Sequence, residues 1–109
     1  MRYFQMTFNE YQDNVGTTRL KTASDTYCFL NLAAEAGEVL SLEAKLIRDG
    51  GDYEYYRQNL KKELGDVLWH IAAIASDHGF SLASIAEANI EKLKGRMARN
   101  TIKGNGDDR

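Results

Sequence analysis

Apolar side chains recur along this chain at steps of three and four residues, which is the period of an α-helix. The clearest stripe predicts a helix from about Gln58 to His78, ended by Gly79. The preceding residues, Tyr53–Tyr56, either begin another helix or stay irregular. The apolar positions of the stripe are Leu60, Leu64, Val67, Ile71 and Ile74.

Capping signals define the first helix. Thr7 and Glu10 have the spacing of a capping box, in which each side chain bonds the backbone amide of the other residue. We predict that this helix runs to about Val15 and that Gly16 ends it, because glycine is a common residue just past a helix end.

A longer second helix is predicted to begin at Ser24 or Asp25 and to run to about Arg48. The segment 49–52, with the sequence Asp-Gly-Gly-Asp, is the clearest break in the chain. The helices on either side of this break could fold into a hairpin.

Ser81 is the expected N-cap of a fourth helix, which runs to about Arg99. Together the patterns predict an all-α fold, a bundle of about four helices in one domain over residues 1–102. A glycine-rich tail at 103–109 should be mobile when nothing is bound. The residues of the fourth helix expected to face inward are Leu82, Ala86, Leu93 and Met97.

The composition agrees with an all-α fold and excludes some classes of protein. The 109 residues include 43% hydrophobic and 28% charged side chains and no proline, which suits uninterrupted helices. A formal net charge of −2 argues against nucleic-acid binding through bulk electrostatics. No apolar run predicts a membrane span or a signal peptide. The single cysteine, Cys28, fits a helix core in a reducing, cytoplasmic compartment.

One pattern occurs twice, 28 residues apart, and it carries the candidate chemistry. Both copies read L-x-x-E-x-G-[E/D]-V-L, the first from Leu32 and the second from Leu60. Residues three apart lie on one face of a helix, so each copy presents two carboxylates side by side. The glycine in each copy costs about 1 kcal/mol within a helix, which suggests the close approach of another helix or a ligand. The four acids are Glu35, Glu38, Glu63 and Asp66.

A hairpin of the two helices would gather these carboxylates around one space, where they repel each other unless a cation lies among them. Glu35 falls within the apolar stripe of its helix, which argues against a merely solvated face. Oxygen donors favour Mg²⁺, with Mn²⁺ as a substitute, over Zn²⁺. Solvated or structural acids are the competing interpretation. His70, four residues after Asp66, is interpreted as a structural residue near the rim of this site.

A second polar set lies in the fourth helix. Asn89, Lys92 and Arg96 occur at i, i+3 and i+7 on the side expected to face the core, and their chemistry suits phosphate. The tail supplies two further cations, Lys103 and Arg109, and its glycines allow the backbone to approach a ligand. We therefore expect the tail to fold over a ligand bound at these residues, in its own or a neighbouring subunit, and a disordered end is the competing interpretation.

These features together resemble the MazG-like nucleoside triphosphate pyrophosphohydrolases. The duplicated acid pairs and the segment Asn89-Ile90-Glu91-Lys92-Leu93-x-x-Arg96 carry the resemblance. It extends from Met6-Thr7-Phe8-x-x-Tyr11-Gln12 to Gly104-x-Gly106-Asp107-x-Arg109. Many relatives have an acid or a glycine at Ala34 and a glycine at Asn100, so this chain departs from them at two positions.

The resemblance implies an all-α fold and Mg²⁺-dependent hydrolysis of ribo- or deoxyribonucleoside triphosphates to the monophosphate and pyrophosphate, as in house-cleaning of nucleotide pools. It also implies a homodimer or homotetramer around a four-helix core, with pockets near subunit contacts. By this resemblance Glu35, Glu38, Glu63 and Asp66 are metal ligands, and Asn89, Lys92 and Arg96 contact substrate.

In the chemistry we expect, Glu38 orients the attacking water, and Lys92 and Arg96 stabilise charge on the leaving pyrophosphate. The competing class is a non-catalytic helical module that binds nucleotide or a partner protein. In such a module the acids are only structural.

Overall fold

The computed structural model describes residues 5–107, which form four α-helices and no strand. The all-α prediction is confirmed. Predictions made for residues 1–4 and for Arg109 lie outside the described residues. No helix within residues 5–107 is both long and apolar enough to cross a membrane. The helices are α1 (Phe8–Thr18), α2 (Asp25–Asp49), α3 (Tyr53–Asp77) and α4 (Leu82–Ala98).

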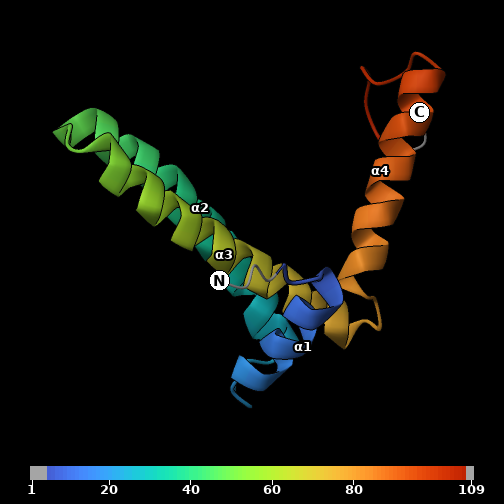
Figure 1. Ribbon diagram of the computed structural model, residues 1–109, viewed down its shortest axis with the longest axis horizontal. Coiled ribbons are helices and arrows are strands. Elements are labelled where there is room, and N and C mark those ends of the chain that lie inside the picture. Colours follow the sequence, from blue (N-terminus) through green and yellow to red (C-terminus); the bar gives the residue numbers. More distant parts are fainter. Residues whose placement is uncertain (1–4, 108–109) are drawn as a thin grey trace.

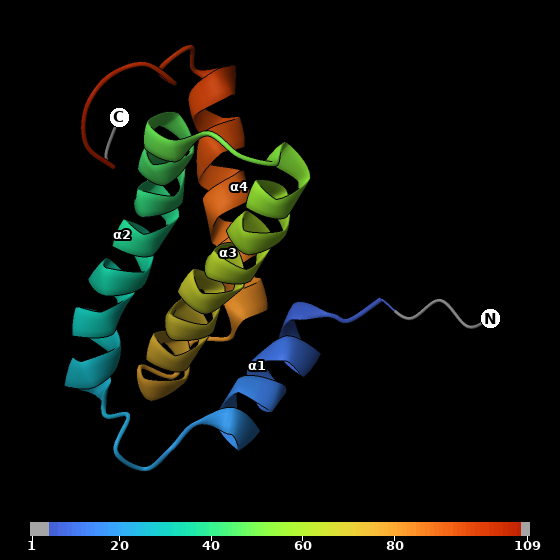
Figure 2. The same ribbon diagram turned by 90° about the vertical axis from the view of Figure 1, so that its left-hand side faces the viewer.

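Two of these helices form a long antiparallel hairpin. α2 and α3 have 25 residues each and pack along their whole length (Figures 1 and 2). α1 packs against α3 near the end of the hairpin that is far from the turn. α4 starts at that same end and diverges from the hairpin as a separate arm (Figure 1).

Each helix begins at a polar side chain that accepts a hydrogen bond from the backbone of its first turn. Thr7 caps α1 and forms a capping box with Glu10, as predicted. Ser24, Asp52 and Ser81 cap the other three helices. Caps of this kind contribute about 1 kcal/mol each, which explains why the N-terminal boundaries are sharp.

Two helices extend beyond their predicted bounds. α1 continues through Gly16 because the hydroxyls of Thr17 and Thr18 donate to carbonyls of the preceding turn and satisfy them. α3 already includes Tyr53–Tyr56, since Asp52 caps it directly after the turn. These tyrosines are therefore helical, and they form the start of α3 and not a separate helix.

The reversal of the chain between α2 and α3 requires glycine. Gly50 has φ +70° and Gly51 has φ +116°, in a backbone region that L side chains rarely adopt. The amide of Gly50 donates to the carbonyl of Leu46 and closes the last turn of α2. The two glycines thus set where the hairpin folds.

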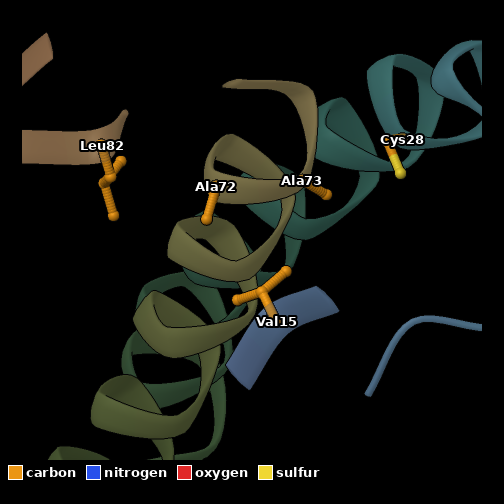
Figure 3. Packing of buried hydrophobic residues seen from close by; sticks show 5 residues of the cluster. All are labelled: Val15, Cys28, Ala72, Ala73 and Leu82. Carbon is orange, nitrogen blue, oxygen red and sulfur yellow. The ribbon is translucent and has the colours of Figure 1, made fainter. Parts of the chain in front are cut away.

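A small core lies where α1 meets α3 and the start of α2. Val15 of α1 lies against α3 near Ala72 and Ala73, whose small side chains let the helices approach (Figure 3). Cys28 is fully buried, which confirms its predicted place in the core. Leu82, the first residue of α4, completes the cluster.

α4 has little of the chain packed against it. Its main helical neighbour is α1, and Met97, which was predicted to face inward, is 66% exposed. That prediction is wrong within one chain, because periodicity identifies an apolar face but not what covers it. The radius of gyration is 17.1 Å, whereas a compact domain of this length has about 13 Å. The accessible surface is 8495 Å², against about 6,100 Å² for a compact monomer of this mass.

A bidentate ion pair fixes the loop between α1 and α2 on α3. The guanidinium of Arg19 donates to both carboxylate oxygens of Asp77, at 2.7 and 2.8 Å, and to the carbonyl of Ala23 at 2.8 Å. Both charged side chains are mostly buried. Hydrogen bonds from Arg19 hold the pKa of Asp77 below its ordinary value of 3.8.

We expect D77N to lower the free energy of unfolding by about 1 kcal/mol at pH 7, because it breaks this ion pair. A carboxylate with a lowered folded-state pKa stabilises the protein above its unfolded pKa, and this contribution disappears as the pH falls through the folded value. Urea unfolding should therefore show wild type and D77N converging in strongly acidic buffer. The exposed-acid control D13N should match wild type throughout. A D77N deficit that is the same at neutral and acidic pH would contradict this account.

Candidate functional site

The hairpin places the two copies of the repeated pattern opposite each other. Glu35 and Asp66 are each 15 residues from the Gly50–Gly51 turn. Glu38 and Glu63 are each 12 residues from it. In antiparallel helices of equal rise, residues equally far from the turn lie at the same level. The turn therefore forms two levels, and at each level one acid of α2 lies opposite one acid of α3.

Three of the four acids come together in the structure. Glu35, Glu63 and Asp66 each offer a carboxylate oxygen, and these oxygens lie within 4.8 Å of one another. Oxygens on opposite sides of a Mg²⁺ ion, bound at about 2.1 Å, stand about 4.2 Å apart, so the cluster fits such a cation after small side-chain rotations. Glu38 lies outside this group and is exposed. Its role as a metal ligand stays a prediction.

The electrostatics of the cluster also favour a cation. Partial burial raises the pKa of Glu63, three neighbouring carboxylates raise it further, and Lys45 opposes them. Within residues 5–107, no member of the three-acid cluster takes part in an ion pair. Uncompensated negative charge therefore accumulates here, and a bound cation would relieve it. The neighbouring carboxylates belong to Asp66, Glu35 and Glu38.

The glycines of the repeated pattern have open space beside them. A methyl group added at Gly37 or Gly65 would meet nothing within 4 Å among the described residues. The described chain therefore leaves room for a side chain at both positions, although the Tyr11 hydroxyl donates to the Gly65 carbonyl at 3.5 Å. The close approach of another helix or a ligand to these glycines stays a prediction.

His70 holds the backbone under Asp66 in place. Its Nδ1 lies 2.7 Å from the Asp66 carbonyl, which can only accept, so Nδ1 carries the hydrogen. In the neutral ring Nε2 then accepts from the amide Nδ2 of Asn31 at 2.9 Å. His70 is only 7% exposed, so it lies in the interior and not at the rim, although its structural role agrees with the prediction.

The role of Asn31 was not predicted from the sequence, although its position in the helix pattern indicates a buried polar residue. It is a polar residue between Cys28 and Leu32, two positions of the apolar stripe of α2, and it lies four residues before Glu35. A polar side chain in such a position is usually hydrogen-bonded in the interior. Its bond to His70 links α2 to α3 one helical turn from the acids.

An open cavity of about 510 Å³ adjoins the acid cluster at Asp66. The indole nitrogen of Trp69 donates to the hydroxyl of Thr18 at 2.9 Å, which fixes the ring at the cavity wall. The cavity thus combines an acidic end with apolar and aromatic walls. Other side chains that line it are Leu20, Ala23, Tyr27, Asn31 and His70.

The predicted phosphate contacts lie elsewhere. Asn89, Lys92 and Arg96 belong to α4, which diverges from the hairpin that carries the acids (Figure 1). We expected acids and cations in separate helices of one small bundle, and within a single chain the structure does not bring the two sets together. The reason is that α4 packs mainly on α1.

The cations of α4 bind the tail of their own chain. Lys92 Nζ and Arg96 Nη2 both donate to one carboxylate oxygen of Asp107, each at 3.1 Å. Arg96 Nη2 also donates to the carbonyl of Gly106 at 3.3 Å. These hydrogen bonds hold the pKa of Asp107 below its ordinary value. The described part of the tail therefore covers Lys92 and Arg96.

Two backbone features turn the tail back. Asn100 has φ +58°, a left-handed conformation that glycine and asparagine adopt with least strain, so asparagine can stand where many relatives have glycine. The amide of Thr101 then donates to the carbonyl of Arg96 at 2.7 Å and closes the end of α4.

Comparisons with known proteins agree with this geometry. The family model of the MazG nucleotide pyrophosphohydrolase domain matches residues 24–99. A relative named Gene 37 protein, from Mycobacterium phage L5, is 36% identical over 86 residues, which cover 77% of this chain and 75% of that protein. No solved structure matches the chain.

We expect E63Q to raise the melting temperature by a few degrees in metal-free buffer, because it removes one of several repelling charges. Millimolar Mg²⁺ should raise the melting temperature of wild type but not that of E63Q, since ligand binding stabilises only a fold that contains the site. Differential scanning calorimetry measures both effects. The control E87Q, an exposed acid of α4, should respond to Mg²⁺ like wild type. Equal Mg²⁺ stabilisation of E63Q would place the ion elsewhere.

Proposed function

Because the chain belongs to the MazG nucleotide pyrophosphohydrolase family, we propose that it hydrolyses nucleoside triphosphates to the monophosphate and pyrophosphate. The observation that carries this proposal is the cluster of Glu35, Glu63 and Asp66, whose oxygens lie within 4.8 Å without an ion-pair partner among the described residues. The reducing cytoplasm, suggested by one fully buried cysteine, is the compartment we propose.

The three clustered acids would hold a divalent cation, Mg²⁺ or Mn²⁺. When bound, such an ion screens phosphate charge and lowers the pKa of an attacking water. Glu38 is exposed beside the cluster, where its carboxylate can orient that water and accept its proton. The water oxygen bonds to the α-phosphorus, and the bond from this phosphorus to the bridging oxygen breaks and releases pyrophosphate.

The rest of the substrate would be divided between two places. The nucleoside would occupy the cavity at Asp66, where Trp69 offers an aromatic wall and Asn31 a hydrogen-bonding amide. Lys92 and Arg96 would stabilise the charge that develops on the leaving pyrophosphate, with Asn89 as a further contact.

Because the acids and the cations of one chain are apart, we propose that a site is completed by α4 of a second copy. The surface in excess of a compact monomer, roughly 2,400 Å² by the same scaling, is in the range that permanent dimers bury. Apolar residues exposed on α4 and on the hairpin are consistent with such burial, among them Met97, Ile90, Leu40 and Leu64. A homodimer around a four-helix core, or a tetramer built from it, is the assembly we propose.

Incubation with a panel of nucleoside triphosphates and Mg²⁺ should release pyrophosphate. Excess chelator should abolish the release, Mn²⁺ should restore it and Zn²⁺ should restore it poorly. Alanine at any of the four acids should lower turnover by at least a hundredfold while circular dichroism still shows the helical fold. Absence of pyrophosphate release from every nucleotide would favour the non-catalytic module. The acids concerned are Glu35, Glu38, Glu63 and Asp66.

Mixing two inactive variants tests whether sites are shared between copies. E63Q loses an acid and K92Q loses a cation, so each homodimer should be inactive. After exchange of subunits, half of the dimers are mixed and contain one intact site of two, which predicts about a quarter of wild-type activity. Sedimentation at low micromolar concentration should show a dimer or tetramer. An active monomer, or no recovery in a mixture shown to contain mixed dimers, would contradict the shared site.

A further inference from the structure

The tail contacts α4 through charged side chains. Two cations, Lys92 and Arg96, converge on a single oxygen of Asp107. Asp107 itself is 81% exposed, whereas the Arg96 side chain is only 4% exposed. Charged hydrogen bonds hold the Asp107 carboxylate, which stays open to solvent, so another anion can reach this position and exchange with it.

The tail leaves part of the arginine unsatisfied. The Nε of Arg96 is buried and has no hydrogen-bond partner, while Nη2 donates to Gly106 and Asp107. A buried donor without an acceptor is unfavourable. A phosphate group offers three oxygens in a tetrahedral arrangement and so more acceptors than the one carboxylate oxygen used now. The cation pair is thus better matched to phosphate than to its present occupant.

We propose that Asp107 is an internal counter-ion that occupies the phosphate position of Lys92 and Arg96, and that a nucleotide must displace it to bind there. This inference rests on the proposed function, because that function assigns phosphate to the two cations. It replaces the sequence-based expectation of a tail that closes over substrate with a tail that competes with substrate. The displaced segment is short, since Asn100 and Thr101 fix the chain at the end of α4.

Two further observations support competition. Lys92 and Arg96 lower the pKa of Asp107, so the carboxylate is ionised at neutral pH and competes as an anion. Gly106, which precedes it, has φ +79°, and this backbone conformation turns the carbonyl and the carboxylate to the same guanidinium. The tail therefore presents a small anionic surface to the cations, as a phosphate ester would.

Binding of pyrophosphate in chelator-containing buffer tests the proposal without catalysis or metal. By isothermal titration calorimetry on the full chain, D107N should bind pyrophosphate about threefold to tenfold more tightly than wild type, since removal of two exposed ion pairs removes the competitor. The control D13N, an exposed acid of α1 with no contact to these cations, should bind like wild type. K92Q should bind more weakly, and R96L should do the same if it folds.

The direction of the tail's movement gives an independent readout. Pyrophosphate should accelerate amide hydrogen exchange of residues 103–107 in wild type, because a displaced tail loses its contacts. Slower exchange would mean that the tail closes over the ligand, and weaker binding by D107N would mean that Asp107 helps to build the site. Either result overturns the proposal.

The test also separates this inference from the proposed function. If K92Q weakens pyrophosphate binding while D107N equals wild type, the phosphate site stands and the internal counter-ion is wrong. If neither wild type nor D107N binds pyrophosphate, both the phosphate assignment and the internal counter-ion fail. If D107N binds and wild type does not, the competition is stronger than expected and the proposal is supported.

Discussion

The packing of α2 against α3 is the constraint on which the rest of this molecule depends. Two glycines with positive φ fix where the chain reverses, and equal distances from that reversal place Glu35 opposite Asp66. The favourable packing of the hairpin thus brings carboxylates together against their mutual repulsion. Partial burial raises the pKa of Glu63, and the neighbouring carboxylates raise it further. A bound cation would offset this repulsion among the carboxylates.

The fold separates the clustered acids of one chain from the cations of α4. Acids lie on two helices that pack together, whereas the cations lie on an arm that packs mainly on α1. One chain therefore holds its clustered acids and these cations in separate places, and the proposed second copy would bring the two sets together while it covers exposed apolar side chains. The Asp107 carboxylate of the tail pairs with both of these cations, Lys92 and Arg96.

Local chemistry made much of this structure predictable. The capping box at Thr7, the caps at Ser24 and Ser81, and the four helices follow from side chains within one turn of each boundary. Features that depend on contacts between residues distant in sequence were harder to predict. The inward face assigned to α4 was wrong for Met97, and the burial of His70 required knowledge of its bond to Asn31, 39 residues away.

The pairing of acids across the hairpin gives the site an approximate twofold symmetry. Only one methylene group, the difference between glutamate and aspartate, distinguishes Glu35 from Asp66. The cluster departs from this symmetry, because two of its acids belong to α3 and only one belongs to α2. The flanks break this symmetry, because Lys45 lies towards the turn and the Asn31–His70 pair lies towards the core. The two flanks of the cluster therefore differ in charge and in hydrogen bonding.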